Sequence, residues 1–174
     1  LTSLSVSGAS AINASAVTTT GNQTYGGLVT LGTDVKLTGP LVADIYRGVV
    51  KKWNDPLIAK YNPGLALPNL PITVVHRSDG SGTTFVFTTY LASKAPRWAA
   101  EAGANDAVKW PTGLGGKGND GVAAYVKQTP GAIGYVEFAF AKQNRLTTTQ
   151  LMNKAGKYVM PAEENFAAAA ANAN

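Results

Sequence analysis

The chain has 174 residues, the size of one ordinary domain, and is long enough to bury a hydrophobic core. Apolar residues make up 45% of it and charged residues only 14%, which indicates a globular protein and excludes a disordered chain. The absence of cysteine excludes disulfides, thiolate metal sites and cysteine nucleophiles. The net charge of +5 comes without a long basic run, so we expect small anions rather than nucleic acid as partners.

Neither an apolar run of about 18 residues nor a charged-then-apolar leader is present in the sequence. We therefore expect a soluble mature form or a fragment. Residues 1–34 differ in character from the rest, because Thr, Ser, Val, Ala, Asn and Gly dominate and no basic residue occurs. Their short alternating pieces predict roughly two to four short strands.

Two pieces of this region, residues 16–25 and 29–39, weakly resemble the repeat units of bacterial surface proteins with stacked β-solenoid arrays. Low-complexity Thr/Gly/Val sequence also matches such repeats by chance. An ordinary β-rich extension is therefore an equal alternative for this segment.

From residue 36 onward, helix and strand signals alternate. Residues 41–46 predict a short amphipathic helix that stops near Gly48. A second helix is expected over residues 57–61, because Asn-Asp-Pro precedes it and Asn-Pro-Gly follows it. Residues 71–76 form an apolar and β-branched run, which predicts a strand.

Residues 77–84, with the sequence RSDGSGTT, follow this strand directly and precede apolar residues at helical spacing. The order predicts a strand, a tight turn and a helix N-terminus. The glycines allow the backbone to turn sharply, and the hydroxyls of Ser81, Thr83 and Thr84 lie beside the free N–H groups of the first helical turn. Together with the positive end of the helix dipole, these donors predict an oxyanion site.

Two charged residues sharpen this prediction. Arg77 can hold a tetrahedral oxyanion through two parallel hydrogen bonds. Asp79 repels an anion unless that anion donates a proton, which monohydrogen phosphate can do and sulfate at neutral pH cannot. Against this, Ser, Gly and Thr before a helix are common caps, and Arg77 and Asp79 could simply pair with each other, so local chemistry leaves the two interpretations even.

Residues 113–121, with the sequence GLGGKGNDG, match the glycine spacing of dinucleotide-binding loops. No buried strand precedes them, and no acidic residue ends a second strand about twenty residues on. We therefore interpret them as a flexible loop that caps a helix over residues 122–128, with Lys117 as an additional anion contact.

The other elements follow from the same signals. Helices are expected over residues 82–93, from Pro96, over 138–143 and over 163–171, strands over 108–110 and 132–136, and a hairpin-like piece over 157–160.

Several long motifs carry a resemblance to a known family. Six segments, in unbroken order, resemble the second lobe of the periplasmic phosphate-binding proteins that feed bacterial ABC-type phosphate transporters: residues 37–48, 52–56, 62–65, 77–84, 113–121 and 131–137. The resemblance covers about residues 35–174. It implies a type II periplasmic-binding-protein-like fold, in which two α/β lobes close on one phosphate.

Carried over by motif, the resemblance implies five phosphate ligands: Arg77, Asp79, Ser81, Gly82 and Thr83. They would act through the guanidinium, a proton-accepting carboxylate, the hydroxyls and the amides of the helix N-terminus. The resemblance also implies a periplasmic, secreted or cell-surface location and the membrane permease of an ABC phosphate transporter as partner. It implies no cofactor and no metal.

The sequence departs from the family because the residues of the first lobe, which carry about half of the phosphate ligands, have no counterpart in it. We therefore expect one α/β lobe over residues 35–174, a β-rich segment over residues 1–34, and a boundary near residues 33–36. Residues 25–30 could stand in for the first strand of the lobe. A largely parallel sheet with helices on both faces is expected, and whether a second chain supplies the other lobe stays open.

The leading function is non-catalytic phosphate binding. His76 has no partner pattern, and Ser81 lacks the glycine two places earlier that marks a nucleophile elbow, so we expect no enzyme. The alternative is a surface or adhesive protein that keeps the lobe fold with weak or no phosphate binding.

Overall fold

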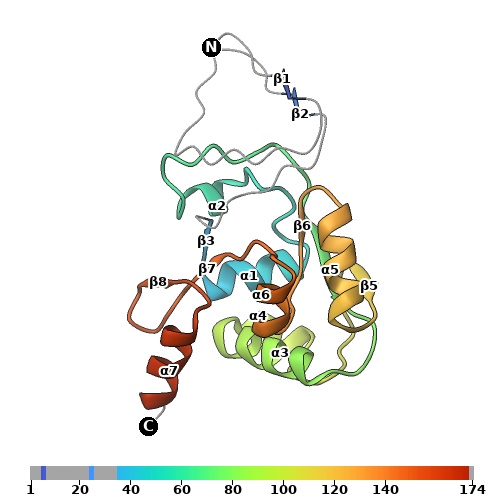
Figure 1. Ribbon diagram of the computed structural model, residues 1–174, viewed down its shortest axis with the longest axis vertical. Helices are drawn as coiled ribbons and strands as arrows, with labels where there is room; N and C mark the ends of the chain where they lie inside the picture. Colours follow the sequence, from blue (N-terminus) through green and yellow to red (C-terminus); the bar gives the residue numbers. More distant parts are fainter. Residues whose placement is uncertain (1–4, 7–23, 26–34, 173–174) are drawn as a thin grey trace.

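The computed structural model describes residues 5–6, 24–25 and 35–172 (Figure 1). Strands β1 (Ser5–Val6) and β2 (Thr24–Tyr25) pair in parallel. The repeat-like pieces expected at residues 16–25 and 29–39 lie largely outside the described residues. So does the segment expected to replace the first strand of the lobe, apart from its first residue. The boundary between residues 34 and 35 stays a prediction.

A parallel sheet with β4 at its centre carries the fold. β4 (Thr73–Arg77) lies between β5 (Leu114–Gly116) and β6 (Ala132–Ile133), and both neighbours run parallel to it. Val74 and Val75 are buried, as is typical of a strand covered on both faces. Because ligands of open α/β sheets bind at the carboxyl ends of the strands, the end of β4 is where a site is expected.

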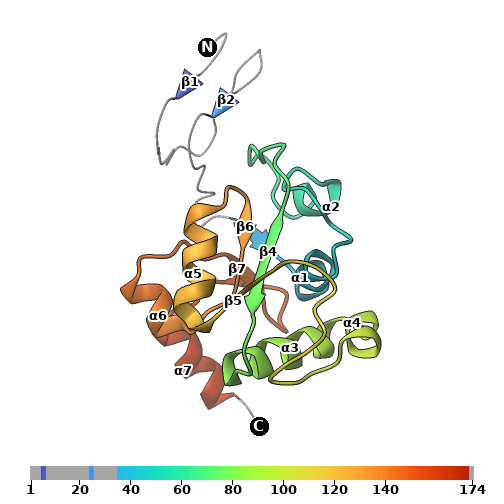
Figure 2. The same ribbon diagram turned by 90° about the vertical axis from the view of Figure 1, so that its right-hand side faces the viewer.

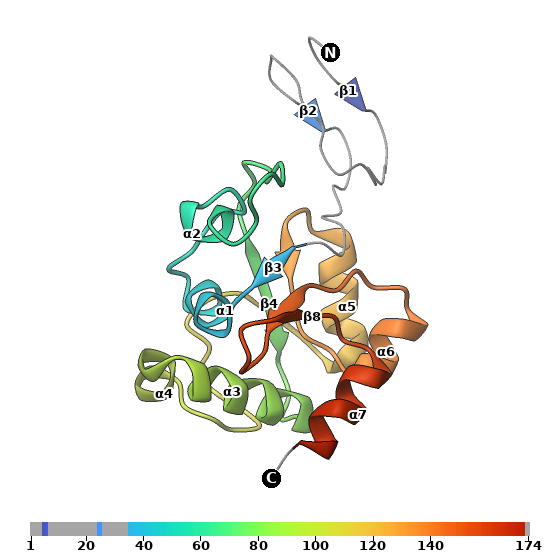
Figure 3. The same cartoon turned by 90° about the vertical axis from the view of Figure 1, so that its left-hand side faces the viewer.

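A second, smaller sheet joins distant parts of the chain. β3 (Lys36–Leu37) pairs in parallel with β7 (Gln150–Met152), and β8 (Tyr158–Val159) returns antiparallel to β7. Figure 3 shows β3 and β8 in front of β4. This pairing confirms the hairpin-like piece expected near the end of the chain.

The helices cover both faces of the main sheet, as expected. α5 packs on one face, and α1 and α3 lie on the opposite side (Figure 2). The bounds are α1 Gly39–Tyr46, α2 Pro56–Ala59, α3 Gly82–Lys94, α4 Pro96–Glu101, α5 Gly118–Gln128, α6 Phe138–Gln143 and α7 Glu163–Ala171. Within the described part of the chain, no helix combines the length and the apolar character that crossing a membrane requires.

Side-chain caps explain where several helices begin. Thr38 accepts a hydrogen bond from the N–H of Leu41 at the start of α1, and Asp55 accepts one from the N–H of Leu57 at the start of α2. In both helices a proline occupies the first turn, where its missing N–H has no cost.

An aromatic cluster fills the space between α1, α3 and the sheet. The ring of Tyr46 contacts Phe87 edge-on at 4.8 Å and lies 6.0 Å from Trp110 and 6.2 Å from Tyr135, measured between ring centroids. Trp98 is fully buried and lies 5.8 Å from Trp110. These rings form part of one continuous hydrophobic core. The core reaches the end of β4, where Trp110 stacks on His76.

One predicted strand is wrong. Residues 108–110 form no strand; instead, the ring of Trp110 stacks on His76 at 4.7 Å and joins the aromatic cluster. Pro111 follows it and has no N–H for a sheet ladder.

The third strand lies in the glycine-rich segment that we expected to be a loop. A Cβ atom added to Gly116 would lie 2.5 Å from the backbone nitrogen of Val122, so only glycine lets β5 run this close to α5. α5 accordingly begins at Gly118, four residues earlier than predicted.

Candidate functional site

The predicted site begins where β4 ends. Arg77 is the last residue of β4, and after a short turn Ser81 forms the N-cap of α3. The Ser81 Oγ accepts hydrogen bonds from the N–H groups of Thr83, at 3.1 Å, and Thr84, at 3.3 Å. The N–H of Ser81 itself donates to the carbonyl of Asp106 at 3.0 Å. The strand, turn and helix N-terminus that the sequence predicted are therefore confirmed.

Open donors remain at this helix end. Gly82 is exposed, and a Cβ atom added to it would meet no atom within 4 Å. Among the described residues, the N–H of Gly82 and the hydroxyl of Thr83 have no hydrogen-bond partner. The Ser81 hydroxyl accepts two bonds and keeps its own hydrogen to donate. These groups can therefore donate to an anion from outside, at the positive end of the helix dipole.

Arg77 and Asp79 form a two-point ion pair. The Arg77 Nε donates to Asp79 Oδ1 at 2.8 Å, and Nη2 donates to Oδ2 at 2.6 Å. The side chains are 11% and 34% exposed, respectively. This side-on pairing occupies one edge of the guanidinium and leaves Nη1 without a partner among the described residues.

The N-terminus of α5 adds a third hydrogen bond to Asp79. The N–H of Gly118 donates to Oδ1 at 3.1 Å. The bonds from Arg77 and from Gly118 hold the pKa of the Asp79 carboxyl well below its ordinary value, and the bonds to Asp79 raise the pKa of Arg77. Asp79 is therefore ionised at neutral pH, and the guanidinium is fixed in direction before any ligand arrives.

This geometry bears on the role predicted for Asp79. Both of its oxygens already accept hydrogen bonds from Arg77 or Gly118. The pairing of Arg77 with Asp79 that we held as an alternative is therefore present, beside a helix end with open donors. A direct contact between Asp79 and the proton of an anion stays a prediction, as do the other four ligand assignments.

Tyr135 is a member of the site that sequence reasoning missed. Its hydroxyl accepts a hydrogen bond from the N–H of Arg77 at 3.2 Å and lies 2.6 Å from the Oγ1 of Thr84. Its partners lie 58 and 51 positions earlier in the chain, so no local pattern marks the role. The only available signal was its place in the motif at residues 131–137.

Lys117 and His76 were also singled out in the sequence. Lys117 is the exposed N-cap residue of α5, directly before the Gly118 that bonds to Asp79. His76 stacks its ring on Trp110, and its Nδ1 lies 3.0 Å from the carbonyl oxygen of Arg77. Over residues 35–172, no three His, Asp or Glu side chains are grouped so that they could hold a metal ion.

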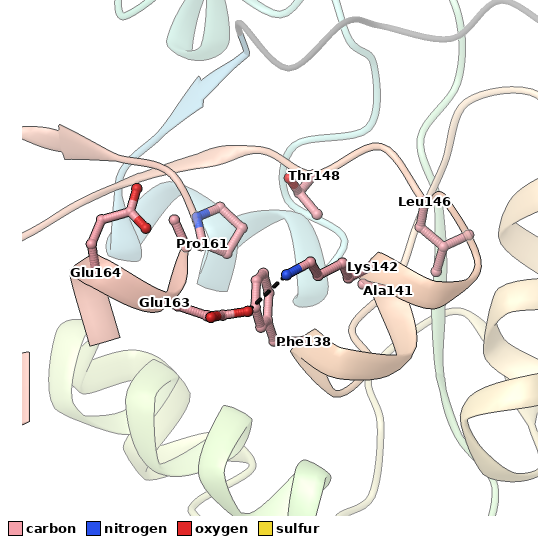
Figure 4. A pocket seen from close by; sticks show the side chains of 9 residues that line it. Phe138, Ala141, Lys142, Leu146, Thr148, Pro161, Glu163 and Glu164 are labelled. Carbon is pink, nitrogen blue, oxygen red and sulfur yellow. Dashed lines mark hydrogen bonds and ion pairs between the residues drawn. The ribbon is translucent and has the colours of Figure 1, made fainter. Parts of the chain in front are cut away.

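A groove of about 400 Å³ lies elsewhere, between α6 and α7 (Figure 4). Phe138, Ala141, Leu146 and Pro161 contribute its apolar lining, and the ion pair between Lys142 and Glu163 crosses it at 2.7 Å. None of the predicted anion ligands lines this groove.

Comparison with known proteins assigns the family. A family model described as a PBP superfamily domain matches residues 11–173. The chain belongs to the PBP superfamily. Three solved structures at 20–23% identity support a PBP-type α/β fold. One is a putative phosphate ABC transporter substrate-binding protein with bound phosphate from Clostridium perfringens, with a TM-score of 0.55, covering 79% of this chain and 46% of that one. A DING protein matches with a TM-score of 0.58 at 22% identity, covering 78% of this chain and 40% of that one.

Curated PBP relatives match at higher identity. The phosphate-binding protein PstS of Pasteurella multocida is 58% identical over 139 residues, which is 80% of this chain and 40% of the relative. The PstS of Haemophilus influenzae is 55% identical over 139 residues (80% and 42%), and that of Methanocaldococcus jannaschii is 46% identical over 142 residues (78% and 36%). The chain thus spans about two fifths of the length of these relatives.

Proposed function

We propose that this chain binds inorganic phosphate, without catalysis, as part of a solute-binding protein for phosphate uptake. One observation carries the proposal: the guanidinium of Arg77, held side-on by Asp79, lies at the same strand end as the open donors of the α3 N-terminus. A tetrahedral dianion satisfies both kinds of donor at once, because it presents several acceptor oxygens in different directions.

The PBP relatives support the same ligand, since they are named phosphate-binding proteins and match over most of this chain. By the same likeness we propose the permease of an ABC phosphate transporter as the membrane partner and a periplasmic or cell-surface location. In such a role the protein carries its ligand and changes no bond of it.

A titration followed by NMR tests the proposal. A ¹⁵N-labelled sample of the chain receives inorganic phosphate, and sodium chloride of equal ionic strength serves as the control. The largest shifts are expected at the amides of Ser81, Gly82 and Thr83 and at the Nε of Arg77. These signals belong to, or lie directly beside, the open donors that would bind phosphate: the N–H of Gly82, the hydroxyls of Ser81 and Thr83, and the Nη1 of Arg77. The loop Asn153–Gly156, a tight turn far along the sequence, provides internal reference signals.

Two results would count against the proposal: shifts scattered over the surface, or no site-specific shift with phosphate at roughly tens of millimolar, where even a weak site is largely filled. Either would favour the alternative of a surface or adhesive protein that has kept the lobe fold and lost the ligand.

A further inference from the structure

We propose that Tyr135 is a positioning residue of the anion site. Its hydroxyl fixes the distance between Arg77 and the first turn of α3, which supply the two kinds of anion donor. The inference rests on the proposed function only for its effect on phosphate affinity, since the positioning itself is a property of the unliganded protein.

The contacts place this hydroxyl between the two donor groups. It accepts the backbone N–H of Arg77 at 3.2 Å and bonds to the Oγ1 of Thr84 at 2.6 Å. Thr84 in turn donates its backbone N–H to the Oγ of Ser81 at 3.3 Å. Tyr135 and Thr84 therefore link the residue that carries the guanidinium to the cap of α3, since Thr84 bonds to Tyr135 through its side chain and to Ser81 through its backbone.

The ring of Tyr135 is held firmly enough to act as a spacer. It stacks on Phe87 of α3, with ring centroids 4.3 Å apart and an interplanar angle of 16°. The residue before it, Gly134, lies against α5, where an added Cβ atom would approach the side chains of Val126 and Val122 to 2.8 and 2.9 Å. Tyr135 thus enters the site from a segment pressed against α5, and its ring has little room to shift.

The protonation state suits this role. Burial raises the pKa of the Tyr135 hydroxyl, so the group stays neutral. It can then accept from the N–H of Arg77 and share a hydrogen bond with the hydroxyl of Thr84, in which either oxygen can be the donor. Thr84 is 1% exposed and Tyr135 is 9% exposed, so neither bond competes freely with water.

Tyr46 shows that packing alone does not require such a hydroxyl. It belongs to the same aromatic cluster, with its ring 6.2 Å from that of Tyr135. Its hydroxyl is buried and has no hydrogen-bond partner among the described residues. The two tyrosines therefore differ in what their hydroxyls do, which makes Tyr46→Phe a matched control for Tyr135→Phe.

The test compares these two variants of the chain by amide hydrogen exchange and by phosphate titration. Tyr135→Phe keeps the ring stack and removes only the oxygen. We expect faster exchange at the N–H of Arg77, because that N–H loses its acceptor. We also expect phosphate binding that is about threefold to tenfold weaker, because the two donor groups are no longer held at a fixed distance. Tyr46→Phe is expected to change neither quantity.

Variants at Thr84 separate positioning from general destabilisation. Thr84→Ser keeps the hydroxyl and should preserve the affinity, whereas Thr84→Val should weaken binding as Tyr135→Phe does. If the two residues act through one bond, the double variant Tyr135→Phe/Thr84→Val is no weaker than the worse single variant. Thr84→Val also carries the test should Tyr135→Phe fail to fold.

Unchanged exchange at Arg77 in Tyr135→Phe would overturn the inference, as would equal losses in Tyr135→Phe and Tyr46→Phe. A wild-type chain that binds no phosphate would contradict the proposed function instead. In that case the exchange rates in the absence of phosphate still decide whether Tyr135 positions Arg77.

Discussion

Asp79 holds the guanidinium of Arg77 along one edge, through Nε at 2.8 Å and Nη2 at 2.6 Å. The pair is close to neutral as a unit, so it does not add a full positive charge to the surface. Its contribution is direction: the free Nη1 is oriented by a carboxylate that is itself anchored to the N–H of Gly118. This relationship determines what substitutions at these three positions should do.

Replacing Arg77 by Ala should weaken phosphate binding about ten- to a hundredfold, because it removes a charge-assisted contact worth roughly 1.5–3 kcal/mol. Calorimetric titration with phosphate measures the loss. Arg97→Ala is the matched control, since it removes one positive charge from an exposed position on α4. Equal phosphate affinities for the Arg77 variant and the wild type would show that Arg77 does not bind the phosphate.

The stability that the Asp79 ion pair provides should depend on pH in one direction. The pKa of Asp79 is lowered in the folded protein, so its contribution is fully present above the unfolded value of about 3.9 and is lost as pH falls from there through the folded value. Urea unfolding of the wild type and of Asp79→Asn measures this between neutral and acidic pH. We expect the gap between their unfolding free energies to be constant above about pH 5 and to shrink below pH 4. A gap that does not change with pH would mean that Asp79 makes no such pair in solution.

The hydrogen bond from the N–H of Gly118 to Asp79 can be tested with a matched control, Gly64. Gly118 has φ = +66° and Gly64 has φ = +80°, and in both cases an added Cβ atom would meet nothing within 4 Å. Either glycine replaced by Ala should therefore cost a similar backbone strain of roughly 1–2 kcal/mol in stability. Of the two glycines, only Gly118 donates its N–H to Asp79, and a shift of the backbone away from the strained positive φ would move that N–H. Only Gly118→Ala should therefore also weaken phosphate binding, by about two- to tenfold. Chemical unfolding and calorimetry on both variants separate the two effects, and a parallel loss of affinity in Gly64→Ala would contradict the anchor.

The sequence correctly predicted the strand, turn and helix start at the end of β4 because their determinants are local. The β-branched strand, the glycine turn and the Ser81 cap lie within about ten consecutive residues, and each acts on its immediate neighbours. The starts of α1 and α2 were predictable for the same reason, because their capping residues and prolines are adjacent in the sequence.

The parts that sequence reasoning missed depend on contacts between distant segments. Two of the three residues of β5 are glycines, so its sequence shows no alternation of apolar and polar side chains. It is a strand because it pairs with β4, where Val75 lies opposite Leu114. Likewise the role of Tyr135 depends on Arg77 and Thr84, both more than fifty positions away. One sequence without these distances gives no basis for either assignment.

The affinity of the 174-residue chain is the last quantity that the geometry predicts. The open donors among the described residues belong to Arg77 and to the start of α3, at Ser81, Gly82 and Thr83, and Gly82 is exposed. An anion held there keeps water on its other face, so its charge is screened and each hydrogen bond competes with solvent. We therefore expect weak phosphate binding, on the order of millimolar or about 4 kcal/mol.

Selection against sulfate should be weak as well, because the Asp79 charge is compensated by Arg77 and a sulfate ion can turn towards water. Calorimetry with phosphate and then sulfate, on concentrated and diluted protein, measures both quantities. Micromolar binding by a proven monomer, with sulfate strongly excluded, would mean that these residues already enclose the anion, whereas affinity that rises with protein concentration would mean that a second copy closes over it.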